Sequence, residues 1–192
     1  MFGLITYRIA TPADAEGILD IYRPYVESTT VTFETQVPTL DEFRQRIETT
    51  LEQYPYLVAE GDGKILGYAY ASAYRSRAGF QWTPELSVYV RQGYHGNGIG
   101  SHLYAGLLDL LRSQGYQNVC SVVSHPNLES EKLHYRFAFR LIGVQRKCGY
   151  KCGRWCDIAI FLRPLGDHPT PPPAPIPFPQ LPKETVDRIL KF

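Results

Sequence analysis

SVYVRQGYHGNGIGS, residues 87–101, joins a strand to a helix and decides the fold of this chain. The strand PELSVYV (84–90) enters a loop with glycines at positions 93, 96, 98 and 100, and apolar residues at helical spacing follow from Ile99 to Leu111. Glycines let backbone N–H groups turn toward a ligand, and the first turn of a helix carries about half a positive charge. The stretch therefore predicts a phosphate site built from backbone amides, with a tight turn that binds nothing as the alternative.

The elements on either side of this stretch alternate between strands and helices. Helical spacing with capping residues predicts the helices, and β-branched runs between Gly-rich turns predict the strands. The predicted order is β-α-α-β-β-β-α-β-α-β-β, with strands at 6–10, 56–60, 65–74, 84–90, 118–124, 141–150 and 154–162 and helices at 12–26, 40–51, 99–111 and 127–137. Hairpins and β-α-β crossovers thus share one sheet, which predicts an α/β fold with helices on both faces.

The composition is that of one globular domain. The chain has 192 residues, 44% hydrophobic and 20% charged, which suffices for a core and excludes a mostly disordered chain. Lys and Arg number 20 against 19 Asp and Glu, and this net charge of +1 excludes broad nucleic-acid binding. The first residues do not resemble a signal peptide and no apolar run approaches ~18 residues, so we expect a cytoplasmic protein that does not bind a membrane.

Prolines are concentrated near the C-terminus. Of the 15 in the chain, nine fall between Pro164 and Pro182. Proline fixes φ and lacks the backbone donor, so this segment cannot join a helix or a central strand. We therefore predict a folded domain over 1–164 and a Pro-rich linker or strap over 165–192 that ends in a short helix.

Three of the four cysteines, Cys148, Cys152 and Cys156, are spaced four residues apart. Zinc sites usually use C-x2-C pairs with further ligands at fixed spacing. We therefore favour reduced thiols near one face of a sheet over a metal site, and we expect no metal.

The glycine loop also carries a family resemblance. HGNGIGS after SVYV resembles the acetyl-CoA pyrophosphate loop (Q/R-x-x-G-x-G/A) of the GNAT N-acetyltransferases, with His95 in place of the first Gln or Arg. Four segments resemble the phosphinothricin and methionine sulfone/sulfoximine acetyltransferases of that family: STTVTFET (28–35), YRSRAGFQWTPELSVYV (74–90), HPNLESEKLH (125–134) and GYKCGRWCD (149–157). The chain departs from the family at Ala138, where glycine is usual, at Pro84, where Val is usual, and in its Pro-rich tail.

The resemblance implies a mixed, mostly antiparallel central sheet and an enzyme. It implies transfer of the acetyl group of acetyl-CoA to the amine of a small amino-acid analogue, by a homodimer. Two alternatives remain open. One is acetylation of protein N-termini or another amine, and the other is a catalytically silent acetyl-CoA sensor whose Pro-rich tail binds an SH3-like domain.

Acetyl transfer needs a group that takes a proton from the amine and a group that gives one to the departing thiolate. The resemblance assigns the first task to Glu85, for which a solvated carboxylate at a strand edge is the alternative. It assigns the second to His134, for which a packed core histidine is the alternative. Tyr135 competes with His134, since consecutive helix residues point ~100° apart. Tyr104 is a further pocket candidate.

For acetyl-CoA, the resemblance assigns the strand, the loop and the start of the next helix. The open strand edge is expected to pair with the pantetheine arm, and the N–H of Val88 to polarise the thioester carbonyl. The predicted cofactor-binding residues are Val88, Tyr89, Val90, His95, Gly96, Asn97, Gly98, Ile99, Gly100, Ser101 and Asn127.

Substrate recognition is assigned mainly to two arginines. Arg75 and Arg77 share one side of an extended segment, and a guanidinium binds a carboxylate through two hydrogen bonds. Solvated loop arginines are the alternative. The predicted substrate-binding residues are Phe33, Glu34, Arg75, Ser76, Arg77, Glu85, Leu86 and Ser87, with Trp82 as a further pocket wall and Trp155 as a core or dimer residue.

Overall fold

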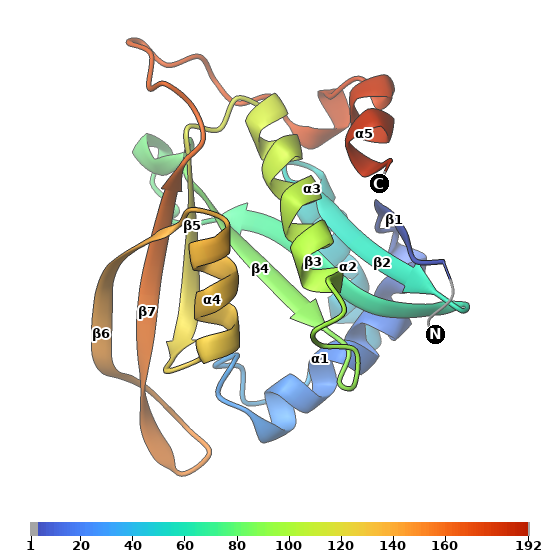
Figure 1. The fold of residues 1–192 in the computed structure, drawn as a ribbon, viewed down its shortest axis with the longest axis vertical. Coiled ribbons are helices and arrows are strands. Elements are labelled where there is room, and N and C mark those ends of the chain that lie inside the picture. The colour runs from blue at the N-terminus through green and yellow to red at the C-terminus, as the bar shows by residue number, and fades with distance from the viewer. Residues whose placement is uncertain (1–3, 192) are drawn as a thin grey trace.

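Seven strands form one sheet in the computed structural model, which describes residues 4–191 (Figure 1). The strands are β1 (Thr6–Ile9), β2 (Tyr56–Gly61), β3 (Lys64–Ala73), β4 (Pro84–Val90), β5 (Asn118–His125), β6 (Arg140–Lys151) and β7 (Arg154–Pro164). Their order across the sheet is β1-β2-β3-β4-β5-β7-β6. All neighbours are antiparallel except β4 and β5. The predicted mixed, mostly antiparallel sheet is therefore confirmed.

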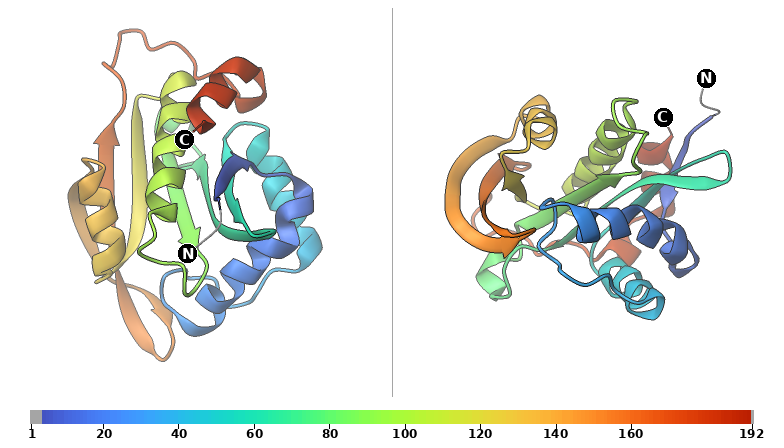
Figure 2. Two further views of the ribbon diagram at one scale, coloured as in Figure 1. Left: turned by 45° about the vertical axis from the view of Figure 1, so that its right-hand side comes forward. Right: turned by 90° about the horizontal axis from the view of Figure 1, so that it is seen from below.

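Helices cover both faces of this sheet, as predicted (Figure 2). They are α1 (Ala15–Ser28), α2 (Leu40–Leu51), α3 (Ile99–Ser113), α4 (Leu128–Arg136) and α5 (Lys183–Leu190). One buried cluster joins α1 and α2 to the sheet and includes Tyr68, whereas the other joins α3 to the sheet and includes Ala69 and Leu86. Adjacent residues of β3 belong to different cores because successive side chains of a strand point to opposite faces.

The helix starts follow the sequence signals. At α2, the hydroxyl oxygen of Thr39 accepts from the backbone N–H of Glu42 (3.3 Å), and the carboxylate of Glu42 accepts from the backbone N–H of Thr39 (2.7 Å). An N-cap of this kind stabilises a helix by about 1 kcal/mol. Residues 29–39, between α1 and α2, form an irregular loop that leads into this cap.

The Pro-rich segment lies against the folded domain. β7 ends at Pro164, the predicted boundary, but Phe178 and Leu181 are buried in the α3 core. The predicted short helix is α5, and it packs on α3. The segment is therefore a strap rather than a free linker, and the core extends beyond the predicted boundary. No helix within residues 4–191 has the length and apolar character needed to cross a membrane.

The four cysteines are free thiols that lie in different surroundings. Cys156 is buried and Cys148 is exposed, while Cys152 lies in the turn between β6 and β7. The prediction that three of them share one face of the sheet is therefore wrong, because an irregular register between Gln145 and Gly149 and the following turn break the four-residue spacing. No group of three His, Cys, Asp or Glu side chains placed to hold a metal occurs in the part of the chain that the structure describes.

Candidate active site

Strands β4 and β5 meet at one point and then part. β4 pairs with β3 from Pro84 to Val90, but with β5 only through Glu85 and Cys120. Figure 1 shows the two strands diverging from there. Beyond Glu85, no described strand pairs with this side of the β4 backbone, and we call this interruption of the strand pairing the opening.

Val88 directs its backbone groups into this opening. On the side away from β3, the carbonyls of Leu86 and Val90 accept hydrogen bonds from the hydroxyls of Ser121 (3.2 Å) and Tyr25 (2.6 Å). Val88 lies midway between them and turns its N–H and C=O to the same side, since residues two apart on a strand do so. No residue of β5 pairs with Val88 in the described chain. Its N–H and C=O suit the amide-containing arm of acetyl-CoA.

The loop between β4 and α3 has the backbone of an anion site. Gly93, Gly96 and Gly98 have φ of +83°, +80° and +80°, a region that glycine adopts at little cost. Gly98 is the N-cap of α3 and has no side chain that could cap the helix. The N–H groups from Ile99 to Ser101 lack partners within the helix, and the helix dipole favours negative charge there. A phosphate group fits this arrangement.

Two side chains brace this loop. The hydroxyl of Tyr25 and Nε2 of His95 form a hydrogen bond (2.9 Å), and Nδ2 of Asn97 donates to two loop carbonyls (3.2 Å each). Both side chains are thus engaged within the protein, and the groups of this loop that remain for an anion are its backbone amides. Arg136 of α4 donates to the hydroxyl of Ser101 (3.4 Å) and adds a positive charge beside the start of α3.

Asn127 begins α4 on the other side of the opening. Its Oδ1 accepts from the backbone N–H of Ser130 (3.2 Å), which makes it the N-cap. The carboxylate of Glu131 accepts from the backbone N–H of Asn127 (3.0 Å) and contacts Nδ1 of His125 (2.9 Å). These bonds fix the side-chain amide of Asn127, and no other described residue uses its Nδ2 donor, which suits the predicted contact with the pantetheine arm.

Glu85 lies at the point where β4 and β5 part. Its side chain is partly buried, and this burial raises the pKa of its carboxyl above the ordinary value. Ser72 is its partner on β3, so both side chains lie on the face that α1 and α2 cover. A partly buried carboxylate with a raised pKa is a stronger base than a solvated one. The alternative of a fully solvated carboxylate does not describe this environment.

His134 lies in the core. It is 2% exposed, and its Nδ1 donates to the carbonyl of Ser130 (2.6 Å), so that Nε2 accepts from the hydroxyl of Tyr104 (2.9 Å). Burial lowers the pKa of His134 and favours this neutral form. The Tyr104 hydroxyl is also hydrogen-bonded to Ser121, which reaches the carbonyl of Leu86. A buried polar chain therefore leads from His134 to the place where the two strands part.

A cavity of about 520 Å³ opens on the same face of the sheet as Glu85. Tyrosines and polar side chains of α1, α2, β2 and β3 line it: Tyr22, Glu42, Phe43, Gln45, Arg46, Thr49, Thr50, Tyr56, Tyr68, Tyr70 and Ser72. It borders β4, because Ser72 pairs with Glu85 and Tyr70 with Ser87, and the side chains of Tyr70 and Ser87 are hydrogen-bonded. Its volume is that of a small-molecule site.

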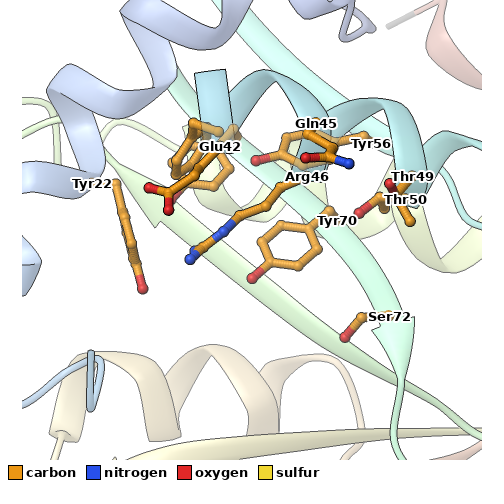
Figure 3. A pocket seen from close by; sticks show the side chains of 11 residues that line it. Tyr22, Glu42, Gln45, Arg46, Thr49, Thr50, Tyr56, Tyr70 and Ser72 are labelled. Carbon is orange, nitrogen blue, oxygen red and sulfur yellow. The ribbon is translucent and has the colours of Figure 1, made fainter. Parts of the chain in front are cut away.

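Arg46 supplies the positive charge of this cavity. Figure 3 shows its side chain extending from α2 between Tyr22 and Tyr70. Its guanidinium forms an ion pair with Glu34 (2.7 Å), a predicted substrate residue on the loop before α2. Glu34 does not itself line the cavity, but its ion pair with Arg46 links it to the cavity wall.

A buried lysine holds the loop that carries Phe33 and Glu34. Nζ of Lys151 donates to the carbonyl of Thr32 (2.7 Å). The ring of Phe33 lies against Gly149, where an added Cβ would stand 2.5 Å from the ring, so a larger residue would displace it. The β6–β7 hairpin therefore positions this loop. The sequence pattern does not mark Lys151, because lysine is almost always exposed.

Arg75 and Arg77 lie on the exposed loop between β3 and β4, together with Ser76. The guanidinium of Arg75 stands 5.0 Å from the ring centroids of both Tyr74 and Phe80. Cation–π contacts of this kind orient a guanidinium at an exposed site. The loop thus presents two cations at the end of β4 where Glu85 lies.

Four residues that the sequence singled out do not line the cavity. Leu86 is buried at 2% exposure in the α3 core, so only its backbone can contact a substrate, and the ring of Tyr89 is packed among other tyrosines. Trp82 donates its indole N–H to the carbonyl of Pro173 (2.7 Å) and does not line the cavity. Trp155 is 62% exposed, which excludes the core position.

Known proteins resemble this chain in sequence and structure. The family profile described as acetyltransferase (GNAT) domain matches residues 7–160. The phosphinothricin N-acetyltransferase of Streptomyces viridochromogenes is 37% identical over 168 residues, 88% of this chain and 91% of that protein. The L-methionine sulfoximine/L-methionine sulfone acetyltransferase of Salmonella typhimurium is 32% identical over 87% of this chain and 98% of that protein. The crystal structure of a phosphinothricin acetyltransferase from Sinorhizobium meliloti in complex with acetyl-CoA has a TM-score of 0.83 and 35% identity, covering 88% of this chain and 92% of that one.

Proposed function

Because the chain belongs to the GNAT family of acetyl-CoA-dependent N-acetyltransferases, we propose that its acceptor is the amine of a small amino-acid analogue of the phosphinothricin or methionine sulfone/sulfoximine type. The observation that carries this proposal is the position of Glu85. Glu85 lies where β4 and β5 part. It also lies on the face of the sheet where the cavity opens, because its partner on β3, Ser72, lines that cavity. A base at this junction can serve an amine that enters from the cavity side.

Glu85 takes a proton from the acceptor amine, directly or through water, because a free amine is mostly protonated at pH 7. Acetyl-CoA supplies an acetyl group as a thioester. The N–H of Val88 points into the opening that suits the pantetheine arm and stabilises the negative charge that develops on the thioester oxygen. The raised pKa of Glu85 strengthens it as a base at neutral pH.

Tyr104 and His134 supply the proton for the departing thiolate. His134 is enclosed by Ser130 and Tyr104, so it acts through the Tyr104 hydroxyl, which lies beside Ser121 where the strands part. This transfer needs His134 with both ring protons, a form that burial disfavours, because only then does Nε2 donate to Tyr104 while the hydroxyl proton passes to the thiolate. The competing residue, Tyr135, is 53% exposed, and its ring lies against Phe161.

Arg77 and Arg75 bind the acidic group of the acceptor. Replacing Arg77 with Gln is expected to raise the acceptor KM about 10-fold, because a hydrogen bond to a charged group contributes roughly 1.5–3 kcal/mol. Steady-state kinetics with each substrate varied in turn measures this, and the KM of acetyl-CoA should not change. Arg112→Gln, at an exposed arginine of α3, is the matched control. An unchanged acceptor KM in Arg77→Gln would show that the loop arginines are only solvated.

A panel of acceptors tests the proposed function. Release of free CoA is measured with methionine sulfone, phosphinothricin and short peptides at saturating acetyl-CoA. We expect turnover with the two amino-acid analogues, because the cavity of about 520 Å³ holds a compact molecule. Turnover with peptides alone would establish the N-terminal acetyltransferase instead. Acetyl-CoA binding without turnover on any amine would establish the sensor.

We further propose that two copies associate through β6. This strand is at the edge of the sheet, and large apolar side chains are exposed around it, namely Leu141, Ile142, Tyr150 and Trp155. An exposed edge with apolar side chains favours pairing with another chain. Light scattering at micromolar concentration should give the mass of a dimer, and a monomer mass would refute this.

The four free thiols favour the cytoplasm as the location of the protein.

A further inference from the structure

We propose that the Pro-rich strap, residues 165–182, fixes the loop 74–83, and that Trp82 is the positioning residue through which it acts. Figure 1 shows the strap crossing one end of the sheet on its way from β7 to α5. The proposal rests on the proposed function in one respect, because Arg75 and Arg77 of this loop are there assigned to the acceptor. The strap would therefore act on acceptor binding and not on acetyl-CoA binding.

The strap and the loop share an anchor at the start of β5. The carbonyl of Trp82 accepts from the backbone N–H groups of Gln117 (3.0 Å) and Asn118 (3.2 Å). The same two residues hold the beginning of the strap. The carbonyl of Gln117 accepts from the N–H of Leu165 (2.8 Å), and the ring Nε2 of His168 is bonded to Oδ1 of Asn118 (3.1 Å).

A direct hydrogen bond joins the middle of the strap to the loop. Nε1 of Trp82 donates to the carbonyl of Pro173 at 2.7 Å, the short end of the range for such bonds. Three consecutive prolines at 171–173 lead up to this carbonyl, and Pro175 follows one residue after it. Because proline has little conformational freedom to lose, the carbonyl of Pro173 is held in place at low entropic cost.

The far end of the strap is anchored in the α3 core. Ile176 donates its N–H to the carbonyl of Gln114 (2.8 Å), and its own carbonyl accepts from Nε2 of Gln114 (2.8 Å). Phe178 donates its N–H to the carbonyl of Gln53 (3.1 Å), and its ring is buried. The strap therefore cannot move away from Trp82 without breaking contacts in the core.

The rest of the loop has mostly internal support. Residues 75–81 are exposed, and the backbone hydrogen bonds found there close the short helix η2 (Ala78–Phe80) on itself. Arg75 is stacked between Tyr74 and Phe80 of the same loop. The placement of both arginines therefore depends on where the two ends of the loop are held, and Trp82 holds the end before β4.

The variant Trp82→Phe tests this proposal, because it removes the indole donor while it keeps an aromatic ring and the backbone carbonyl that Gln117 and Asn118 bind. We expect the acceptor KM to rise about fivefold, the effect of losing one hydrogen bond, with kcat and the KM of acetyl-CoA changed less than about twofold. Amide hydrogen exchange, followed by mass spectrometry, should become faster in residues 74–83 and remain unchanged in residues 93–101. The exchange measurement does not depend on what Arg75 and Arg77 bind.

Val186→Ala is the matched control, because Val186 of α5 packs on the α3 core and takes no part in the hydrogen bonds of Trp82. It should lower the melting temperature and leave the acceptor KM and the exchange of residues 74–83 unchanged. Unchanged exchange in Trp82→Phe, or the same KM shift in Val186→Ala, would overturn the role of the strap. Faster exchange in Trp82→Phe with an unchanged acceptor KM would confine the strap to the shape of the loop and refute its role in acceptor binding, whereas failure of Arg77→Gln alone would refute the assignment of the arginines.

Discussion

Replacing Glu85 with Gln is expected to lower kcat about 10²–10⁴-fold, the usual contribution of a general base. The amide has nearly the shape of the carboxylate but cannot take a proton from the amine. Glu85 directs its side chain to the α1–α2 face, whereas the acetyl-CoA contacts proposed for Val88 and the glycine loop are made by backbone groups. The Kd of acetyl-CoA, measured by calorimetry, should therefore change less than about twofold.

Glu184→Gln on α5 is the matched control for this variant, because it makes the same chemical change at an exposed position outside the site. Its kcat should equal that of the unaltered chain. Unchanged kcat in Glu85→Gln would place the base elsewhere. Parallel loss of acetyl-CoA binding would show that Glu85 supports the cofactor site instead of the proton transfer.

Replacing Gly98 with Val is expected to raise the Kd of acetyl-CoA about 100-fold. Gly98 has φ of +80° at the N-cap of α3, and a β-branched residue in this region costs of order 1–3 kcal/mol. An added Cβ would meet only the ring of His102 at 3.5 Å, an ordinary contact, so the effect comes from the backbone conformation. A changed backbone turns the first N–H groups of α3 away from the phosphates.

Gly63→Val separates this effect from general strain. Gly63 lies in the β2–β3 turn with φ of +70°, and an added Cβ would meet no atom within 4 Å. The change should lower the melting temperature by a similar amount and leave the Kd of acetyl-CoA unchanged. Equal effects of the two variants on Kd would show that the glycine loop binds the cofactor no more directly than any other turn.

Local patterns in the sequence predict most of the fold. The bounds of β4 and the start of α3 follow from PELSVYV and the glycines after it, and the Thr39 capping box marks the start of α2. These signals are local, because each depends on residues within one turn or one strand. The prediction from the cysteine spacing is wrong for the same reason. It requires one regular strand, but a bulge in β6 and a turn interrupt the strand.

The walls of the site could not be predicted in this way. Arg46 faces the cavity because α2 packs across β3, and the ion pair with Glu34 joins residues of a helix and a loop. Period-two tyrosines at positions 68 and 70 show that they share a face, but not that a cavity lies on it. Trp82 turns to Pro173, 91 residues later, and no local pattern reports such a contact.

The pH dependence of kcat/KM for the acceptor, compared between the unaltered chain and Glu85→Gln, tests the central claim most directly. Ionisation of the acceptor amine affects both proteins equally, so it cancels when kcat/KM of the unaltered chain is divided by kcat/KM of Glu85→Gln. A base works only when it is deprotonated, and burial raises the pKa of Glu85. The ratio should therefore fall as the pH falls through a pKa above ~4.3, the ordinary value for Glu, and level off above it. A ratio that stays constant with pH would contradict the assignment of Glu85 as the base.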